Sequence, residues 1–265
     1  MSHRHRISFA VVTLGLVSAV AACAQPIPMH WTVEGVERRA LVFAPAAGAG
    51  GGKAPVVFGF HGHGGTAQTA AAAMGFQRLW PQALVVYMQG LPTPSKVDPL
   101  GKRPGWQHAV GELGDRDLKF FDAVLATLRA KYPVDERRIY ASGFSNGAFF
   151  TYFLWATRGK TFAAFAPCAG LIWPTLHLTE PRPLLQIGGE RDPLVLLPDQ
   201  MQTVETVRSL DGATGAGQAC GAGCTLYPSP KKAPVAVIVH PGGHVFPPWA
   251  AAKIVEFFKA HPLAP

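Results

Sequence analysis

Uninterrupted apolar strands that alternate with helices are the sequence feature that most restricts the fold of this chain. The predicted strands lie at 55–60, 84–88, 138–143, 162–166, 184–188 and 235–239. The predicted helices lie at 66–80, 117–131, 146–158 and 249–260, after a hairpin-like alternation at 31–44. Strands without polar alternation are typical of parallel sheets that helices cover on both faces. The sequence therefore predicts an α/β fold with a mostly parallel central sheet.

The N-terminus has the pattern of a targeting segment. Arg4 and Arg6 precede an apolar run at 7–22, and Ala-Cys-Ala stands before Gln25. This pattern predicts a signal peptide at 1–24 and one domain at 25–265, secreted, periplasmic or extracellular. Val20-Ala21-Ala22-Cys23 also resembles a lipoprotein signal, which would leave a lipid anchor on Cys23 as the one link to a membrane. A retained membrane anchor is the third alternative.

Composition restricts the partners. The 265 residues are 48% hydrophobic and 15% charged, which excludes a disordered chain. The net charge of +8 is spread along the chain without a basic stripe, so no nucleic-acid partner is expected.

Cys220 and Cys224 flank Gly-Ala-Gly and form a candidate disulfide, a bond that export favours.

The sharpest motif is Gly143-Phe144-Ser145-Asn146-Gly147, between a predicted strand and a predicted helix. In that context Gly-x-Ser-x-Gly is typical of a nucleophile elbow, where a tight turn projects the serine and small residues relieve crowding. Ser145 is therefore the predicted nucleophile, and a plain Gly/Ser turn is the alternative.

A serine hydroxyl needs a neighbouring base. With this elbow the partners follow in the order Asp/Glu, His, each after a strand. Asp192 follows the strand 184–188 and His244 follows the strand 235–239. Their rivals are His240, at the strand end, and Glu190 and Asp199 beside Asp192.

Backbone amides near the serine are expected to bind an oxyanion. The first is that of Asn146, directly after the nucleophile, and the second lies in His61-Gly62-His63-Gly64-Gly65, most simply at His63. His61-x-His63 lacks a third ligand nearby, so no metal is predicted. Gln89, Trp106 and Trp173 follow strand ends and are candidate substrate-binding residues, with packing as the alternative.

These residues also carry a resemblance. Phe-His-Gly-His-Gly-Gly-Thr-Ala at 60–67, Tyr-Met-Gln-Gly-Leu at 87–91, the segment 132–148 and Pro-Gly-Gly-His at 241–244 resemble secreted polyhydroxybutyrate depolymerase-like esterases, which sit beside feruloyl and acetylxylan esterases. The resemblance covers about residues 30–260 and implies the α/β-hydrolase fold with catalytic Ser145, Asp192 and His244. Relatives often have a cysteine where His63 stands, and polymer-degrading relatives often carry an additional binding domain.

Together these features predict an exported serine esterase that works through an acyl-enzyme without a cofactor, on small or oligomeric esters of the hydroxybutyrate type. A feruloyl- or acetylxylan-type carbohydrate esterase is the main alternative. A serine peptidase of the same fold and a non-catalytic surface-binding protein are more distant ones.

Overall fold

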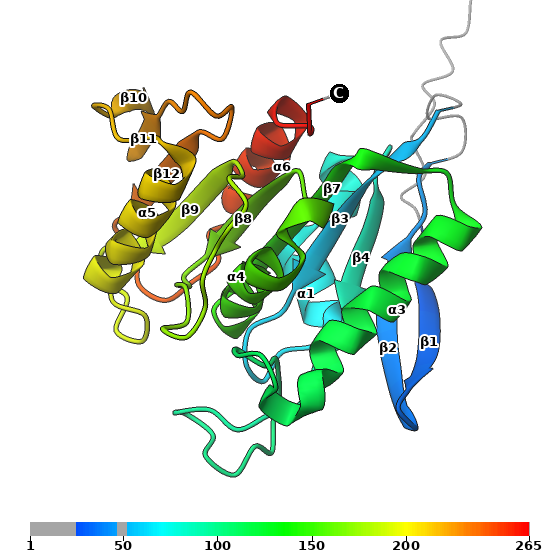
Figure 1. Cartoon of the computed structure of the whole chain (residues 1–265). Coiled ribbons are helices and arrows are strands. Elements are labelled where there is room, and N and C mark those ends of the chain that lie inside the picture. The colour runs from blue at the N-terminus through cyan, green and yellow to red at the C-terminus, as the bar shows by residue number, and fades with distance from the viewer. Residues whose placement is uncertain (1–24, 47–51, 265) are drawn as a thin grey trace, which may run out of the picture.

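A ten-stranded sheet forms the centre of the computed structural model, which describes residues 25–46 and 52–264 (Figure 1). Its strand order is β1 (Ile27–Val33), β2 (Val36–Phe43), β4 (Leu84–Met88), β3 (Ala54–Phe60), β7 (Val134–Phe144), β8 (Ala164–Cys168), β9 (Leu184–Gly189), β12 (Val235–His240), β11 (Cys224–Tyr227), β10 (Gln218–Gly221). The strands from β4 to β12 in this order pair in parallel, and antiparallel strands flank them on both sides. The predicted α/β fold is therefore confirmed.

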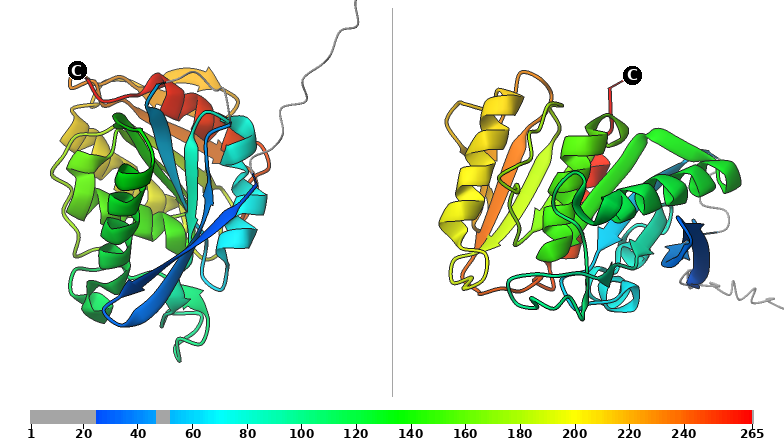
Figure 2. Two further views of the ribbon diagram at one scale, coloured as in Figure 1. Left: turned by 90° about the vertical axis from the view of Figure 1, so that its right-hand side faces the viewer. Right: turned by 60° about the horizontal axis from the view of Figure 1, so that its bottom comes forward.

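Helices cover both faces of the sheet, as a parallel sheet requires. The helices are α1 (Ala67–Met74), α2 (Phe76–Leu79), α3 (Arg116–Lys131), α4 (Asn146–Arg158), α5 (Leu197–Asp211) and α6 (Ala250–Ala260). One core packs α3, α4 and α5 against one face, and a second core packs α1, α2 and α6 against the other. The left view in Figure 2 shows the sheet between these two layers.

The site lies at one edge of the sheet because parallel strands end together. Strands β3, β4, β9 and β12 are almost wholly buried, which explains their continuous apolar sequences, and β7 is buried from Ile139 to Gly143. Their carboxyl ends lead into the loops that begin at His61, Gln89, Ser145, Glu190 and Pro241. Ligands of open parallel sheets bind beyond this edge, so the predicted site residues lie where such a site is expected.

Several elements differ in extent from the prediction. The helix predicted at 66–80 is two helices, because Gly75 adopts φ +56° and ends α1. Strand β7 begins at Val134, before the predicted 138. The loop predicted at 91–114 contains a short hairpin, β5 (Leu91–Pro92) and β6 (Pro104–Gly105), and the 3₁₀ turn Glu112–Asp115. A second 3₁₀ turn, Gly159–Thr161, follows α4.

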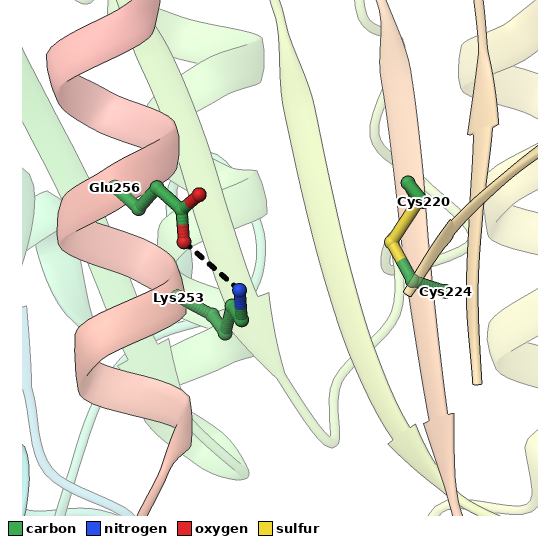
Figure 3. Close-up of a disulfide and its surroundings, with 4 residues drawn as sticks. All are labelled: Cys220, Cys224, Lys253 and Glu256. Atoms are coloured by element: carbon green, nitrogen blue, oxygen red, sulfur yellow. Dashed lines mark hydrogen bonds and ion pairs between the residues drawn. A yellow bond between two sulfur atoms is a disulfide. The ribbon is translucent and has the colours of Figure 1, made fainter. Parts of the chain in front are cut away.

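The sheet edge formed by β11 and β10 carries the disulfide. Cys220 and Cys224 are joined across the turn between these strands, with the two Cα atoms 5.0 Å apart (Figure 3). Antiparallel pairing to β12 places this hairpin beside the sheet. The disulfide agrees with the pairing that the sequence predicts, whereas the two strands were not predicted.

The expected signal peptide at 1–24, with Cys23, lies outside the described residues. Within the part of the chain that the structure describes, no helix combines the length and apolar character needed to cross a membrane.

Candidate active site

Ser145 occupies a tight turn between β7 and α4. Its backbone has φ 54° and ψ −121°, a region that residues other than glycine rarely adopt. Its amide donates to the Cys168 carbonyl oxygen of β8 at 3.0 Å, which holds the turn against the neighbouring strand. A Cβ at Gly143 would lie 2.1 Å from the Gly147 carbonyl oxygen, and one at Gly147 would lie 2.3 Å from that of Phe60. The flanking glycines are therefore required by close backbone approach.

His244 connects Ser145 to Asp192. The imidazole Nε2 lies 2.8 Å from Ser145 Oγ, and Nδ1 lies 2.8 Å from Asp192 Oδ2. The second carboxylate oxygen, Oδ1, accepts the backbone amides of Leu194 and Val195, each at 2.9 Å. Asp192 is buried, and these donors fix the orientation of its carboxylate. The three predicted residues, which lie far apart in the sequence, are therefore in hydrogen-bond contact.

The rival residues do not join this chain of hydrogen bonds. His240 is at the end of β12, where its Nδ1 accepts the Gly242 amide at 3.0 Å, and burial lowers its pKa. Glu190 and Asp199 are exposed, and Asp199 lies in the first turn of α5. None of the three rivals is therefore hydrogen-bonded to Ser145, His244 or Asp192.

The loop after β3 lies directly against the serine, since a Cβ on Gly62 would be 3.4 Å from the Cβ of Ser145. The Gly64 amide donates to the Pro104 carbonyl oxygen and the Gly65 amide to that of Gly62. The His63 amide donates to no acceptor among the described residues. The Asn146 amide belongs to the first turn of α4, where amides have no partner within the helix. Both amides are thus free to bind an anionic oxygen.

The histidines of this loop are fixed by protein groups. Burial lowers the pKa of His61 to about 4, and its Nε2 accepts the Gly90 amide at 3.0 Å. His63 Nε2 lies 3.1 Å from Asp98 Oδ2. Among the described residues no cluster of three or more His, Cys, Asp or Glu side chains is arranged to hold a metal ion.

Two predicted substrate-binding residues are packing residues, which corrects the expectation for them. Trp106 has no exposed surface, stacks on Phe150 and donates its indole N–H to the His61 carbonyl oxygen at 2.9 Å. Gln89 is buried, accepts the Ala67 amide and donates to the Gly90 carbonyl oxygen. Both side chains hold the loops of the site together and are covered by protein atoms, so they offer little surface to a ligand.

Trp173, the third candidate, is partly exposed. Its ring stacks on His108, with centroids 4.8 Å apart, and meets Phe149 edge to face at 6.0 Å. Phe149 lies one turn into α4, and its amide donates to the Ser145 carbonyl oxygen. Trp173 therefore borders the start of α4, close to the serine. His108 and Phe149 could not be singled out from the sequence, since neither belongs to a motif.

A mainly apolar cavity of about 410 Å³ opens beside His244. Gly62 and His63 form one wall, and Ala70, Ala73 and Met74 of the α1 region form another. Phe144, Val245 and Phe246 complete the lining next to His244. The cavity has the size and the mainly apolar lining of a small-molecule site, and its polar lining side chains are His61, His63, Thr69 and His244.

A parallel sheet with a serine at a strand-to-helix elbow, and an acid and a histidine after later strands, defines the α/β-hydrolase class. A solved acetyl xylan esterase from Aspergillus awamori has the same fold, with a TM-score of 0.66 at 15% identity over 88% of this chain and 99% of that one. No family model matches the chain.

Sequence relatives identify the family. Feruloyl esterase C from Emericella nidulans is 30% identical over 217 residues, 77% of each chain. A bifunctional acetylxylan esterase/xylanase from Neocallimastix patriciarum is 31% identical over 80 residues, and this match spans 30% of the chain and 12% of that relative's length. The chain belongs to the feruloyl esterase C family.

Proposed function

We propose that this protein is an exported serine esterase in which Ser145, His244 and Asp192 act as a catalytic triad. The contact that carries the proposal is the continuous hydrogen-bond chain from Ser145 Oγ through His244 to Asp192, with 2.8 Å at both steps. Geometry of this kind lets an imidazole activate a serine hydroxyl while a buried carboxylate orients the imidazole.

In the proposed reaction Ser145 Oγ attacks the ester carbonyl carbon while His244 Nε2 takes its proton. The amides of His63 and Asn146 donate to the oxyanion that forms. When the tetrahedral intermediate collapses, the C–O bond to the alcohol breaks and the alcohol takes the proton from His244. Water then repeats the sequence on the acyl-enzyme, which releases the acid and restores Ser145.

Replacement of the nucleophile tests the chemistry. Ser145→Ala should lower kcat on a short-chain nitrophenyl ester by about 10⁵-fold or more, as loss of a triad serine does elsewhere. It should also abolish labelling by a fluorophosphonate. Ser209→Ala removes an exposed hydroxyl on α5 and is the matched control. Turnover or labelling of Ser145→Ala at the level of this control would refute the proposed role, and an inert wild type would favour the non-catalytic binding protein.

For the substrate we propose soluble or oligomeric esters of the hydroxybutyrate type, which the resemblance of the motif segments supports. The alternative is a feruloyl- or acetylxylan-type carbohydrate esterase, which the two relatives support about as well. Partly exposed Trp173 is the remaining candidate for substrate contact. Comparison of kcat/KM for hydroxybutyrate oligomers, methyl ferulate and acetylated xylan oligomers separates them, and a preference for either of the last two overturns the first choice.

The proposed export rests on the N-terminal sequence pattern. Residues 25–265 would then form a single catalytic domain, consistent with one sheet that contains strands from both ends of the described chain. Mass spectrometry of the mature protein tests this. An N-terminus at Gln25 is expected for signal cleavage, an acylated Cys23 indicates the lipoprotein alternative, and an intact Met1 contradicts both.

A further inference from the structure

The side chain of Asn146 has one possible orientation. Its Oδ1 lies 2.7 Å from the backbone nitrogen of Trp106, which can only donate, so this atom must be the amide oxygen. The Nδ2 group therefore points the other way, toward the Trp106 carbonyl oxygen at 3.3 Å and His108 Nε2 at 2.6 Å. The assignment depends on a backbone group with fixed polarity, so it does not rest on a choice between two similar atoms.

The orientation of Asn146 fixes the state of His108. Because Nδ2 donates, His108 Nε2 must accept, and an imidazole nitrogen that accepts carries no proton. His108 is therefore neutral, with its proton on Nδ1. A protonated Nε2 would place two donors 2.6 Å apart and break this contact.

Packing holds the His108 ring in this place. The ring stacks on Trp173 with an angle of 17° between the planes, and Phe149 meets it edge to face at 5.6 Å. The backbone amide of His108 donates to Glu112 Oε2 at 2.6 Å. The ring is thus fixed on two sides, which leaves its Nε2 directed at Asn146.

The surroundings of His108 favour the neutral form. Burial lowers its pKa, and His63 of the loop after β3 acts in the same direction. Glu112 on the same loop and Asp117 on α3 act in the opposite direction, but the effect of burial is the largest. The pKa of His108 therefore lies below the ordinary histidine value, which agrees with the accepting role that the geometry requires.

We propose that neutral His108 is a positioning residue that holds Asn146, and with it the first turn of α4, in the conformation in which the Asn146 backbone amide binds the oxyanion. This rests on the proposed function of that amide. Asn146 directly follows the strained Ser145, so its side-chain bonds to Trp106 and His108 link the elbow to the loop after β4. Neither proton transfer nor substrate contact is assigned to His108.

Two substitutions separate this role from simple packing. His108→Gln offers an amide oxygen as an acceptor but has no ring, whereas His108→Phe keeps a ring to stack on Trp173 but has no acceptor. If acceptance from Asn146 matters, the Phe variant should lose about 100-fold in kcat with little change in KM, similar to loss of one oxyanion donor. The Gln variant should stay within about fivefold of wild type.

The reverse order, with Phe close to wild type and Gln impaired, would mean that the ring serves only packing and would overturn the proposal. A rise in KM without a fall in kcat in the Phe variant would assign His108 to substrate contact and would also overturn it. Wild type and both variants are compared on the same short-chain nitrophenyl ester at neutral pH, with thermal unfolding as the check on folding.

A measurement on the wild-type protein does not depend on how the variants fold. Nitrogen NMR of ¹⁵N-histidine-labelled protein reports which ring nitrogen carries the proton, and the His108→Gln spectrum identifies the His108 signals. At neutral pH we expect Nδ1 protonated and Nε2 unprotonated, and a proton on Nε2 would refute the proposal. This readout requires no activity, so failure of the proposed esterase chemistry and failure of the His108 role remain distinguishable.

Discussion

Asp192→Asn is predicted to abolish most activity through the tautomer of His244, and the structure indicates why. Asp192 Oδ1 accepts two backbone amides, those of Leu194 and Val195. If the new Asn turned its NH₂ group toward these amides, donors would face donors in a buried place, at a cost of about 1–3 kcal/mol for each unpaired group. The amide oxygen will therefore stay on them, and the NH₂ group will face His244.

A donor opposite His244 Nδ1 reverses the tautomer. Nδ1 must then accept, so the proton moves to Nε2, which faces Ser145 Oγ at 2.8 Å. The imidazole keeps a hydrogen bond at each end but has lost the lone pair that would take the serine proton. The corresponding change in a serine protease lowers kcat by about 10⁴-fold, which equals roughly 5.5 kcal/mol of barrier.

The assay is the steady-state hydrolysis of a short-chain nitrophenyl ester at neutral pH. Asp199→Asn is the matched control, because it removes the same charge from an exposed position in the first turn of α5, the helix that follows Asp192 in the chain. We expect a loss of about 10⁴-fold in kcat for the first variant and none for the control. If Asp192→Asn keeps more than about a tenth of the wild-type kcat, the tautomer argument is wrong.

Two further substitutions test the elbow and a buried acid. Gly147→Ala places a Cβ 2.3 Å from the Phe60 carbonyl oxygen, so it should lower the free energy of unfolding by about 1–3 kcal/mol and also lower kcat. Gly215→Ala is the control, because a Cβ there meets no atom within 4 Å, and it should change neither quantity. Unfolding and rate assays on both variants measure these effects. Burial raises the pKa of the Asp211 carboxyl to about 8 in the folded protein, above the ordinary aspartate value of about 4, so folding favours the neutral carboxyl. The stability that this carboxyl contributes is therefore complete below about pH 4 and is lost as the pH rises toward 8. Asp211→Asn should therefore raise Tm by several degrees at pH 8 and by almost nothing at pH 4, and an equal change at both pH values would contradict the assignment.

The residues that the sequence located correctly are those that local rules place. Ser145 lies in a short motif between a strand and a helix, and Asp192 and His244 each follow a buried strand. Parallel strands bring their carboxyl ends to one edge, so order along the chain was enough to predict that the three lie together. The contact distances of 2.8 Å needed the structure.

The residues that the sequence misplaced depend on tertiary packing. Trp106 and Gln89 do follow a strand end, but a position near the site does not say whether a side chain faces the ligand or the interior. Trp106 faces inward because Phe60 and Phe150 provide an aromatic environment for its ring. His108 had no signal at all, since its partner Asn146 is 38 positions further along the chain.

The long loop after β4 shows why such contacts escape sequence analysis. It has little regular secondary structure, so buried side chains satisfy its backbone instead. Asp117 Oδ2 accepts the Gln107 amide, and Gln107 Oε1 accepts the Asp117 amide in return. Arg38 of β2 donates to Asp117 Oδ1 at 2.7 Å and to the carbonyl oxygens of Arg116 and Gln89.

A buried ion pair such as Arg38–Asp117 is weak evidence for stability, since desolvation offsets much of the attraction. In this protein the Arg38–Asp117 pair instead orders the loop after β4. Gln107 stands between Trp106 and His108, so the bonds that fix Gln107 also place the two neighbours that hold Asn146. The polar side chains that order this loop are Arg38 of β2, Asp117 of α3 and Asn146 of α4. These three segments lie too far apart in the sequence for one short window to contain them. The geometry of the proposed oxyanion site therefore depends on the tertiary fold, although the Ser145 motif itself is recognisable from five residues.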